Sequence, residues 1–183
     1  MVAVVLLTLA LGVGAVTAIY SLVDATLFRP LAFPESDRLA MLYLTRTSAA
    51  GGASQLRWSY PKLEHLRRSA ASFESIAGFT RADANITGGR EPERVVAEVV
   101  SAGYFRTLRV EAALGRTFLP EEDRAPGGPP VVVLGHGLWQ RRFGGDPSII
   151  GHTSSVNSVP LTVVGVLPRS FRGWRRGSPM RII

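Results

Sequence analysis

The sequence predicts an α+β protein in which one transmembrane helix precedes a single domain of mixed strands and short helices. Val2 to Val23 contains no charged residue, whereas the residues that follow are charged and rich in turn formers. Short apolar runs typical of buried strands alternate there with short amphipathic stretches typical of helices. Residues 24–183 are enough for one domain with its own core.

The charge-free run is long enough to cross a membrane. At about 1.5 Å per residue a helix over residues 2–23 spans about 33 Å, which exceeds the hydrocarbon core of a bilayer. A cleaved signal peptide is the alternative, and Val16 and Ala18 would suit a cleavage site. Such a peptide needs a basic leader and a shorter apolar core. We therefore predict an uncleaved anchor over residues 1–23.

Three small residues repeat at four-residue spacing within this run. Ala10, Gly14 and Ala18 fall on one face of the predicted helix. Small residues at that spacing let a second helix approach closely, so these three are candidates for helix packing. The alternative is that alanine and glycine are simply common in such helices.

Composition restricts the chemistry of the chain. The net charge is +7, Lys62 is the single lysine, and acidic residues are interspersed among most of the arginines, which indicates an ordinary mixed surface. Cysteine is absent, which excludes disulfides and cysteine-ligated metals. The arginines of residues 169–183 lack nearby carboxylates and predict a basic, disordered tail. Contact with anionic lipid headgroups is the alternative, and the scattered arginines with few aromatics predict no nucleic-acid binding.

Turn signals divide the remainder of the chain. Arg29-Pro30 and Phe33-Pro34 interrupt helix formation, so residues 24–38 are an exit segment and residues 39–168 the core domain. The predicted strands cover residues 39–45, 73–79, 84–87, 94–100, 131–134, 153–157 and 161–166, the last two forming a hairpin that turns through Ser158 and Pro160. Predicted helices begin near Ser59, Ser101 and Gly137, with both serines as N-caps.

Catalytic, cofactor and metal motifs are not recognisable in the sequence. No phosphate-binding loop of the Gly-x4-Gly-Lys type and no Gly-x-Ser-x-Gly elbow is present. His65, His136 and His152 lack the close spacing of a zinc site, so we expect packing or surface roles for them. The acidic residues 121–123 predict a solvated loop. We therefore expect a protein with no catalytic, cofactor-binding or metal-binding residues.

The apolar start and the later blocks together resemble one protein family. The start, LTLALGVGAVTAIYSLVDATLFRPLAFP, resembles the first transmembrane helix and exit segment of MacB-type ABC permeases. Six further segments resemble, in order, successive blocks of the periplasmic core domain of these permeases. They are SYPKLEHLRR, NITGGREPERV, VSAGYFRTLRVEAALGRTF, EED, VVVLGHGLWQRRFGGDPSIIG and LTVVGVLP. The resemblance runs from Leu6 to about Arg172. Within this family the chain is similar to the FtsX-related, macrolide-exporter-like permeases abundant in acidobacteria.

The resemblance implies a non-catalytic periplasmic domain of a permease. A separate ABC ATPase would hydrolyse the nucleotide, and its strokes would move the periplasmic domain through the membrane helices for export or mechanotransmission. Partners implied are membrane lipid, the ATPase subunit and other permease helices, and a homodimer is compatible with it. Family members continue into three further membrane helices, which do not follow here, so we expect a fragment of a longer permease or a truncated product.

The resemblance also bears on location. Positive residues normally remain on the cytoplasmic side, and Arg29 and Arg38 follow the apolar run, which taken alone would place the domain in the cytoplasm. The resemblance implies the opposite side: one pass through the cell inner membrane, with the domain in the periplasm.

Two other functions stay open. A membrane-anchored extracytoplasmic sensor or protein-binding module would be favoured by a partly apolar pocket. An anchored hydrolase would need a nucleophile beside a base, for instance a serine next to His136.

Overall fold

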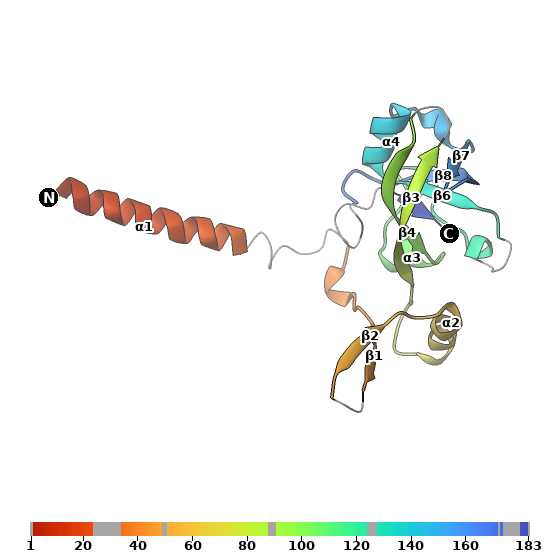
Figure 1. Ribbon diagram of the computed structural model, residues 1–183, viewed down its shortest axis with the longest axis horizontal. Helices are drawn as coiled ribbons and strands as arrows, with labels where there is room; N and C mark the ends of the chain where they lie inside the picture. Colours follow the sequence, from red (N-terminus) through yellow and green to blue (C-terminus); the bar gives the residue numbers. More distant parts are fainter. Residues whose placement is uncertain are drawn as a thin grey trace. The chain divides into compact units, whose positions relative to one another are not determined.

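The computed structural model describes residues 2–23, 34–48, 51–87, 91–123, 128–171, 173 and 180–182. The chain divides into two units, Met1–Leu31 and Ala32–Ile183. The first contains helix α1, and the second contains all the strands (Figure 1).

The elements follow one another in mixed order along the chain. The helices are α1 Val2–Val23, α2 Tyr60–Ser69, α3 Tyr104–Thr107 and α4 His136–Phe143, and the 3-10 turns are η2 Ser36–Arg38, η3 Pro120–Asp123 and η4 Pro147–Ile149. The strands are β1 Leu44–Thr47, β2 Ala53–Leu56, β3 Phe79–Thr87, β4 Glu93–Val100, β5 Leu114–Gly115, β6 Val131–Leu134, β7 Thr153–Val156, β8 Val159–Val166 and β9 Met180–Ile182.

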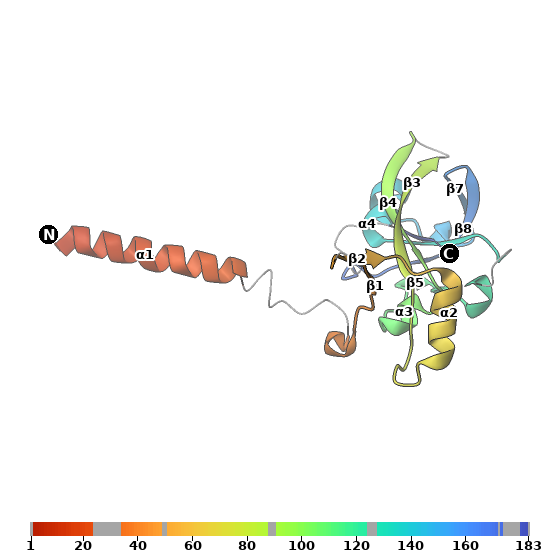
Figure 2. The ribbon, with the colours of Figure 1, turned by 60° about the horizontal axis from the view of Figure 1, so that its bottom comes forward.

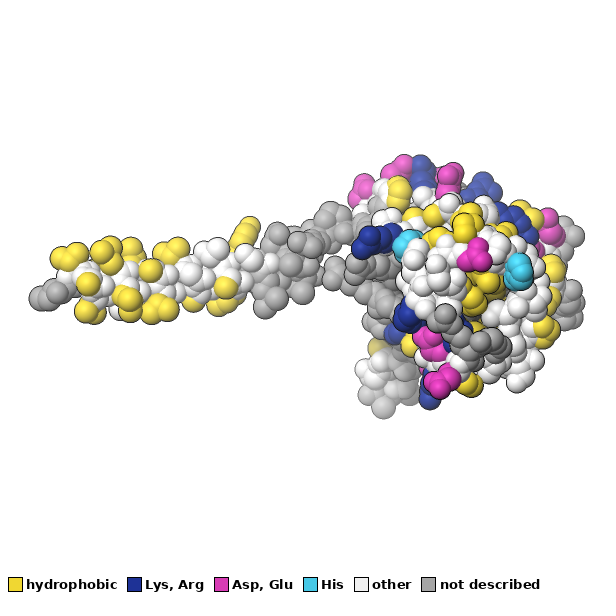
Figure 3. All heavy atoms as spheres, turned by 90° about the horizontal axis from the view of Figure 1, so that it is seen from above, with side chains coloured by type: hydrophobic (Ala, Val, Ile, Leu, Met, Phe, Trp, Pro, Cys, Tyr) yellow, Lys and Arg dark blue, Asp and Glu magenta, His cyan; other side chains and the backbone are white. Residues whose placement is uncertain are grey.

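Helix α1 is apolar on every side, and Figure 3 shows its hydrophobic side chains projecting all round it. Val2–Ser21 has a mean hydropathy of 2.5 and is long enough to cross a membrane. The hydroxyl of Thr8 donates to the carbonyl of Val4 at 3.1 Å, and that of Thr17 donates to the carbonyl of Val13 at 2.8 Å. These polar groups are satisfied inside the helix, as a lipid environment requires.

The second unit is built on a seven-stranded mixed sheet in the order β5-β8-β6-β9-β4-β3-β7. Strand β7 also pairs with β8, so every strand except β5 belongs to one closed ring. Strand β5 pairs with the far end of β8. Closure of this kind removes free sheet edges, which explains how such short strands form a stable body.

Apolar residues on the two faces of the sheet form two separate cores. One core joins β3, β4, β6, β7 and β8 to Leu138 of α4, and the other packs β6 and β8 against Tyr104 and Phe105 of α3. Strand β6 contributes to both because its side chains alternate: Val132 and Leu134 enter the first core, and Val131 and Val133 the second. Helices α3 and α4 therefore pack in different cores, and Figure 2 shows α4 beside the upper parts of β3 and β4 and α3 near their lower end.

A bulge and two glycines shape β8. The pairing of β6 with β8 shifts between Val132 and Val133, so that Val164 is skipped. Gly115 of β5 pairs with Gly165 of β8, and a Cβ on Gly165 would lie 2.0 Å from the carbonyl oxygen of Arg116. Gly115 also has φ +70. Glycine at both positions lets β5 approach β8 this closely.

Several predicted elements are confirmed with shifted ends. Strands β4, β6, β7 and β8 and helices α2, α3 and α4 correspond to predicted elements, while the two weak strands 73–79 and 84–87 are one strand, β3. The β7–β8 turn is Asn157-Ser158, both with positive φ, and Pro160 lies inside β8. Such a pair of residues forms the tight turn preferred by hairpins.

The two predicted N-caps differ in outcome. Ser59 is the N-cap of α2 but makes no capping side-chain hydrogen bond. Gly103, not Ser101, is the N-cap of α3. The Ser101 hydroxyl instead accepts the backbone N–H of Gly78 at 3.0 Å, which ties the start of β3 to the end of β4. The prediction for Ser101 is wrong because a tertiary partner takes its oxygen.

The structure corrects the prediction of a disordered tail at residues 180–182. These residues form β9, which lies between β4 and β6, parallel to the first and antiparallel to the second. Phe171 is also buried in the second core. The core therefore includes residues beyond 168, whereas residues 172, 174–179 and 183 lie outside the described part of the chain.

The predicted core strand 39–45 is also placed differently. Strand β1 begins at Leu44 and, within the part of the chain that the structure describes, pairs only with β2, forming a two-stranded sheet separate from the ring. Ala53 and Ser54 begin β2, for which no strand was predicted. The hairpin extends from the body in Figure 1, and most of its residues are exposed.

Candidate functional site

Four charged side chains link the segment that follows α1 to the body of the second unit. We call Glu35, Arg38, Glu74 and Arg109 the ionic cluster. Each arginine contacts both glutamates: Arg38 lies 2.8 Å from Glu35 and 3.1 Å from Glu74, and Arg109 lies 2.5 Å from Glu35 and 3.4 Å from Glu74. The cluster thus joins residues 35–38 to the loop before β3 and to the end of α3.

The backbone places Arg109 where glycine is usual. Helix α3 ends with the N–H of Val110 donating to the carbonyl of Phe105 and that of Arg109 donating to Arg106. These two hydrogen bonds form the Schellman motif, in which the residue with left-handed backbone conformation is mostly glycine. Arg109 has φ 52. An arginine here costs about 1 kcal/mol of backbone strain.

Residues 35–39 are held at two further points. Glu35 is also left-handed, with φ 53, and begins the 3-10 turn η2. Leu39 packs against the second core. The Ser75 hydroxyl donates to that of Thr107 at 3.0 Å, so the loop that carries Glu74 is fastened to α3 as well. Apolar and ionic contacts together fix this segment to the domain.

The cluster is exposed, which limits its energy. Side-chain exposures range from 41% for Glu35 to 68% for Glu74. Exposed ion pairs contribute about 0.2–1 kcal/mol each and weaken in salt. The hydrogen bond and charge of Glu35, with the charge of Glu74, raise the pKa of Arg38 above its ordinary value. The cluster positions a segment more than it stabilises the fold.

A hollow of about 710 Å³ lies beside the ionic cluster. Pro34 and Arg109 line it together with Phe105, Val110, Pro168 and Phe171. It is open to solvent and combines apolar walls with the arginine side chain. A small molecule or a peptide side chain could enter it, which is the feature that a binding module would need.

The acidic residues 121–123 are not simply solvated, contrary to the prediction. Glu122 is buried and accepts hydrogen bonds from Arg116 at 3.0 and 2.6 Å and from the N–H of Leu119 at 2.8 Å. Asp123 accepts the N–H of Ala102 at 2.9 Å. Burial alone would raise the pKa of Glu122, but the bonds from Arg116 and Leu119 outweigh it and lower the pKa. Only Glu121 remains exposed.

The histidines are not part of a catalytic arrangement among the described residues. The ring of His136 packs edge-on against Trp139 at 5.5 Å. No histidine ring is hydrogen-bonded to a serine hydroxyl in the described ranges. The same ranges hold no group of three His, Cys, Asp or Glu side chains suited to a metal.

The predicted helix-packing residues lie on α1. Ala10, Gly14 and Ala18 are exposed, and no atom lies within 4 Å of the position that a Cβ on Gly14 would occupy. Ala10 and Gly14 line an open hollow on the helix surface together with Leu7, Leu11 and Ala15. The space that a neighbouring helix would use is therefore open beside two of the three.

Sequence reasoning missed the ionic cluster. Glu35 and Arg38 are three residues apart directly after Pro34, and that spacing is a local signal for an ion pair. Glu74 and Arg109 carry no such signal because they approach only through the tertiary fold. The buried Glu122 was equally hidden among its acidic neighbours.

Known proteins with similar sequence or fold agree with one another. Residues 2–181 match the family model of the MacB-like periplasmic core domain. A stretch of 67 residues, 37% of this chain and 10% of the relative, is 37% identical to a probable syringafactin export ATP-binding/permease protein, SyfD, of Pseudomonas syringae pv. tomato. The chain thus spans a small part of that relative.

Two solved structures share the fold. The extracellular domain of the noncanonic ABC-type transporter YknZ from Gram-positive bacteria has a TM-score of 0.54 and 16% identity, over 68% of this chain and 62% of that one. The periplasmic region of MacB from Actinobacillus actinomycetemcomitans has a TM-score of 0.50 and 19% identity, over 64% and 60%. These likenesses confirm the predicted α+β fold, and with the match over residues 2–181 they show that the chain belongs to the MacB-like periplasmic core domain family.

Proposed function

We propose that this chain is the membrane-anchored periplasmic part of an ABC transporter permease and that the ionic cluster transmits movement between its anchor and its domain. The observation that carries the proposal is that residues 35–39, which follow α1 by about a dozen residues, are fixed to the domain by Leu39 and by the ionic cluster. A displacement of the anchor that reaches Glu35 would pass directly to α3 and to the loop before β3.

The anchor in this proposal is α1, which spans the inner membrane once in this chain and contacts lipid. Its face of Ala10, Gly14 and Ala18 packs against another permease helix or against a second copy, because small residues allow close approach. We propose that residues 24–38 connect the helix to the domain, as the sequence suggested.

The energy in this proposal comes from a separate ABC ATPase subunit. The SyfD relative is described as an ATP-binding/permease protein, so nucleotide binding and the permease occur together there. The domain described here acts without catalysis. Its histidines pack or face solvent, and its buried Glu122 accepts hydrogen bonds from a backbone N–H and from an arginine.

The absence of cysteine makes location straightforward to test. A single cysteine at Ser54→Cys or Ser148→Cys, both exposed positions, is treated with a membrane-impermeant maleimide in intact spheroplasts. We expect labelling before lysis. Labelling only after lysis would place the domain in the cytoplasm and contradict the proposal.

Coupling is tested with a nitroxide attached to Ser36→Cys in the full chain, reconstituted in lipid. We expect Arg109→Ala to increase the mobility of this label in the electron paramagnetic resonance spectrum, because Glu35 loses its ion pair with Arg109. Arg94→Ala is the matched control, since Arg94 forms an exposed ion pair with Asp83 at 2.8 Å outside the cluster. Equal spectra for all three proteins would refute the coupling role.

A membrane-anchored sensor or protein-binding module is the second candidate function. The hollow beside Arg109 supports it, because it combines apolar walls with a cation. Arg106 also lines this hollow. Saturable binding of a small anionic ligand that is lost in Arg106→Ala, with Ser36 label mobility unaffected by Arg109→Ala, would favour this function over coupling.

A further inference from the structure

We propose that the outer edge of strand β1 is a strand-addition site for an extended, acidic segment of a partner protein. Among the described residues the hairpin β1–β2 pairs with no other strand, whereas the strands of the ring have partners on both sides. Isolated two-stranded hairpins are marginally stable in water and gain from a third strand. The inference concerns the partner of the domain and does not depend on which side of the membrane it occupies.

The hydrogen-bond register shows which backbone groups are free to pair. Ser48 donates its N–H to the carbonyl of Gly52 at 2.8 Å, which makes these two a hydrogen-bonded pair. Hydrogen-bonded and non-hydrogen-bonded pairs alternate along an antiparallel ladder. Arg46 lies opposite Ser54, two residues along from Ser48 and Gly52, so these two are also a hydrogen-bonded pair. Arg46 therefore turns its N–H and carbonyl toward β2, while Thr45 and Thr47 turn theirs to the outer edge.

Two of the features by which proteins usually protect an edge strand, a bulge and an interrupting proline, do not occur in this hairpin. Strand β1 is short and carries the charged Arg46, a charge that an acidic partner strand would neutralise. Strands β1 and β2 pair in continuous register, contain no proline, and are exposed over most of their length. Thr45 and Thr47 are β-branched and favour the extended conformation that an added strand requires.

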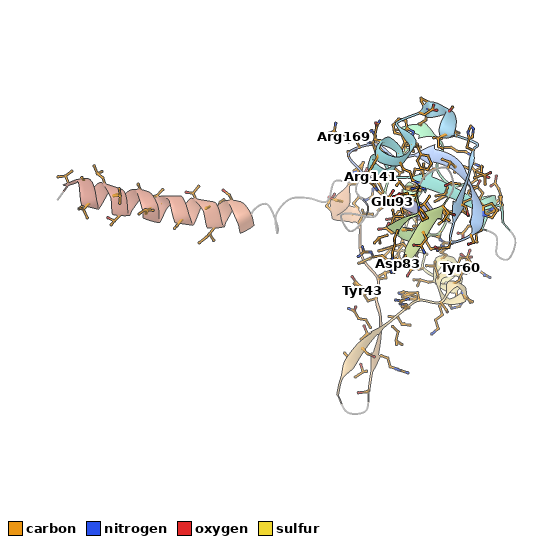
Figure 4. All side chains as sticks on the ribbon, turned by 45° about the horizontal axis from the view of Figure 1, so that its top comes forward. Tyr43, Tyr60, Asp83, Glu93, Arg141 and Arg169 are labelled. Atoms are coloured by element: carbon orange, nitrogen blue, oxygen red, sulfur yellow. The ribbon has the colours of Figure 1, made fainter. Side chains whose placement is uncertain are left out.

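Exposed apolar side chains lie where the chain enters the hairpin. Tyr43 is 57% exposed and Leu42 is 38% exposed, although both are large hydrophobic residues. Figure 4 shows Tyr43 at the base of the hairpin. The indole N–H of Trp58 donates to the carbonyl of Leu42 at 3.1 Å, which holds the two ends of the hairpin together. An added strand would cover this apolar surface.

Charge indicates the kind of segment that fits. No acidic residue occurs between Asp37 and Glu64, whereas Arg38, Arg46, Arg57 and Lys62 fall in that stretch. An acidic strand is therefore attracted, while the same hairpin of a second copy would bring arginines together. Anionic lipid would satisfy the arginines but not the backbone edge, so a protein segment fits both features.

The test uses the full chain in nanodiscs of phosphatidylcholine and two fluorescein-labelled octapeptides, one alternating valine with glutamate and one alternating valine with lysine. Binding is measured by fluorescence anisotropy. We expect saturable binding of the glutamate peptide only. Thr45→Pro removes an outward N–H and should weaken binding about tenfold, as expected for loss of a backbone hydrogen bond and its neighbour. Arg46→Glu should weaken it by a similar factor.

Two controls separate the edge from general damage. Thr45→Val keeps the N–H and should bind as the parent does, and Ala53→Pro alters the opposite edge and should also bind normally. Thermal unfolding of the domain should not change, because the hairpin pairs with no strand of the ring.

Four results would overturn the proposal. They are equal binding of the lysine peptide, no effect of Thr45→Pro, equal losses for Thr45→Pro and Ala53→Pro, and displacement of the peptide by phosphatidylglycerol vesicles that bind Thr45→Pro as well as the parent. The last result would assign the hairpin to a membrane surface. None of them bears on the maleimide test of location, so the two proposals fail separately.

Discussion

Two of the sets of Arg–Glu contacts in the molecule differ chiefly in the burial of the carboxylate. In the pair Arg116–Glu122 the carboxylate is 3% exposed and also accepts a backbone N–H. In the ionic cluster every side chain is more than 40% exposed, and the contacts join segments far apart in the chain. The buried pair holds η3 and β5 together locally. The exposed cluster joins residues 35–38 to the loop before β3 and to the end of α3.

The difference shows that similar chemistry serves two purposes. A buried carboxylate must keep its partners, since losing them leaves an uncompensated charge. An exposed carboxylate is solvated in either state, so its contacts can form and break at small cost. Exposed carboxylates therefore suit a contact that must respond to movement of an anchor better than buried ones do.

The largest expected effect is on the buried pair. Glu122→Ala should lower the free energy of unfolding by about 2–3 kcal/mol, because Leu119 N–H loses its acceptor and Arg116 its partner. Urea unfolding measures it. Glu121→Ala is the matched control, since this exposed neighbour should change stability by less than about 0.5 kcal/mol. Similar losses in both variants would remove the distinction between buried and exposed acids.

The next effect is on pH dependence. The pKa of Glu122 in the folded protein is lowered, despite burial, by the bonds from Arg116 and Leu119. Its contribution is therefore present above the pKa of the unfolded chain and is lost as the pH falls through the folded value. Urea unfolding between about pH 5 and about pH 3 should show a steeper loss for the parent than for Glu122→Gln. Parallel curves would contradict the assignment.

A smaller effect distinguishes backbone from side chain at Arg109. Arg109→Ala keeps the left-handed strain and removes the ion pairs, whereas Arg109→Gly removes both. The glycine variant should be more stable than the alanine variant by about 1 kcal/mol in urea unfolding. Both variants should increase the mobility of a nitroxide attached to Ser36→Cys by the same amount. A less stable glycine variant would mean that the backbone at 109 is not strained.

The smallest effect is that of salt on the ionic cluster. At about 1 M salt the Debye length falls to about 3 Å, so exposed contacts weaken. We expect the mobility of the Ser36 label to rise with salt in the parent, with a stability change below about 1 kcal/mol. Arg109→Ala should show a much smaller salt response. An equal response in both proteins would mean that the cluster does not hold the segment.

Local patterns were sufficient where one element's own residues decide its structure. The charge-free run predicts α1, and the valine-rich stretches predict β4, β6 and β8, because burial on one or both faces is written into consecutive residues. The resemblance of ordered blocks correctly predicted the family. Pairings between distant segments had no such signal: neither β9 between β4 and β6 nor the closure of the ring through β7 and β8 can be read from periodicity.

By itself the sequence determined that an apolar helix precedes an α+β domain, since hydrophobic spacing alone separates residues suited to lipid from those suited to a water-facing core. Only the tertiary structure decided that Glu122 is buried while Glu121 is not, that Arg109 meets Glu35, and that β1 stands outside the ring. The physical reason is that burial of a charge, long-range ion pairing and a free sheet edge are properties of neighbours in space.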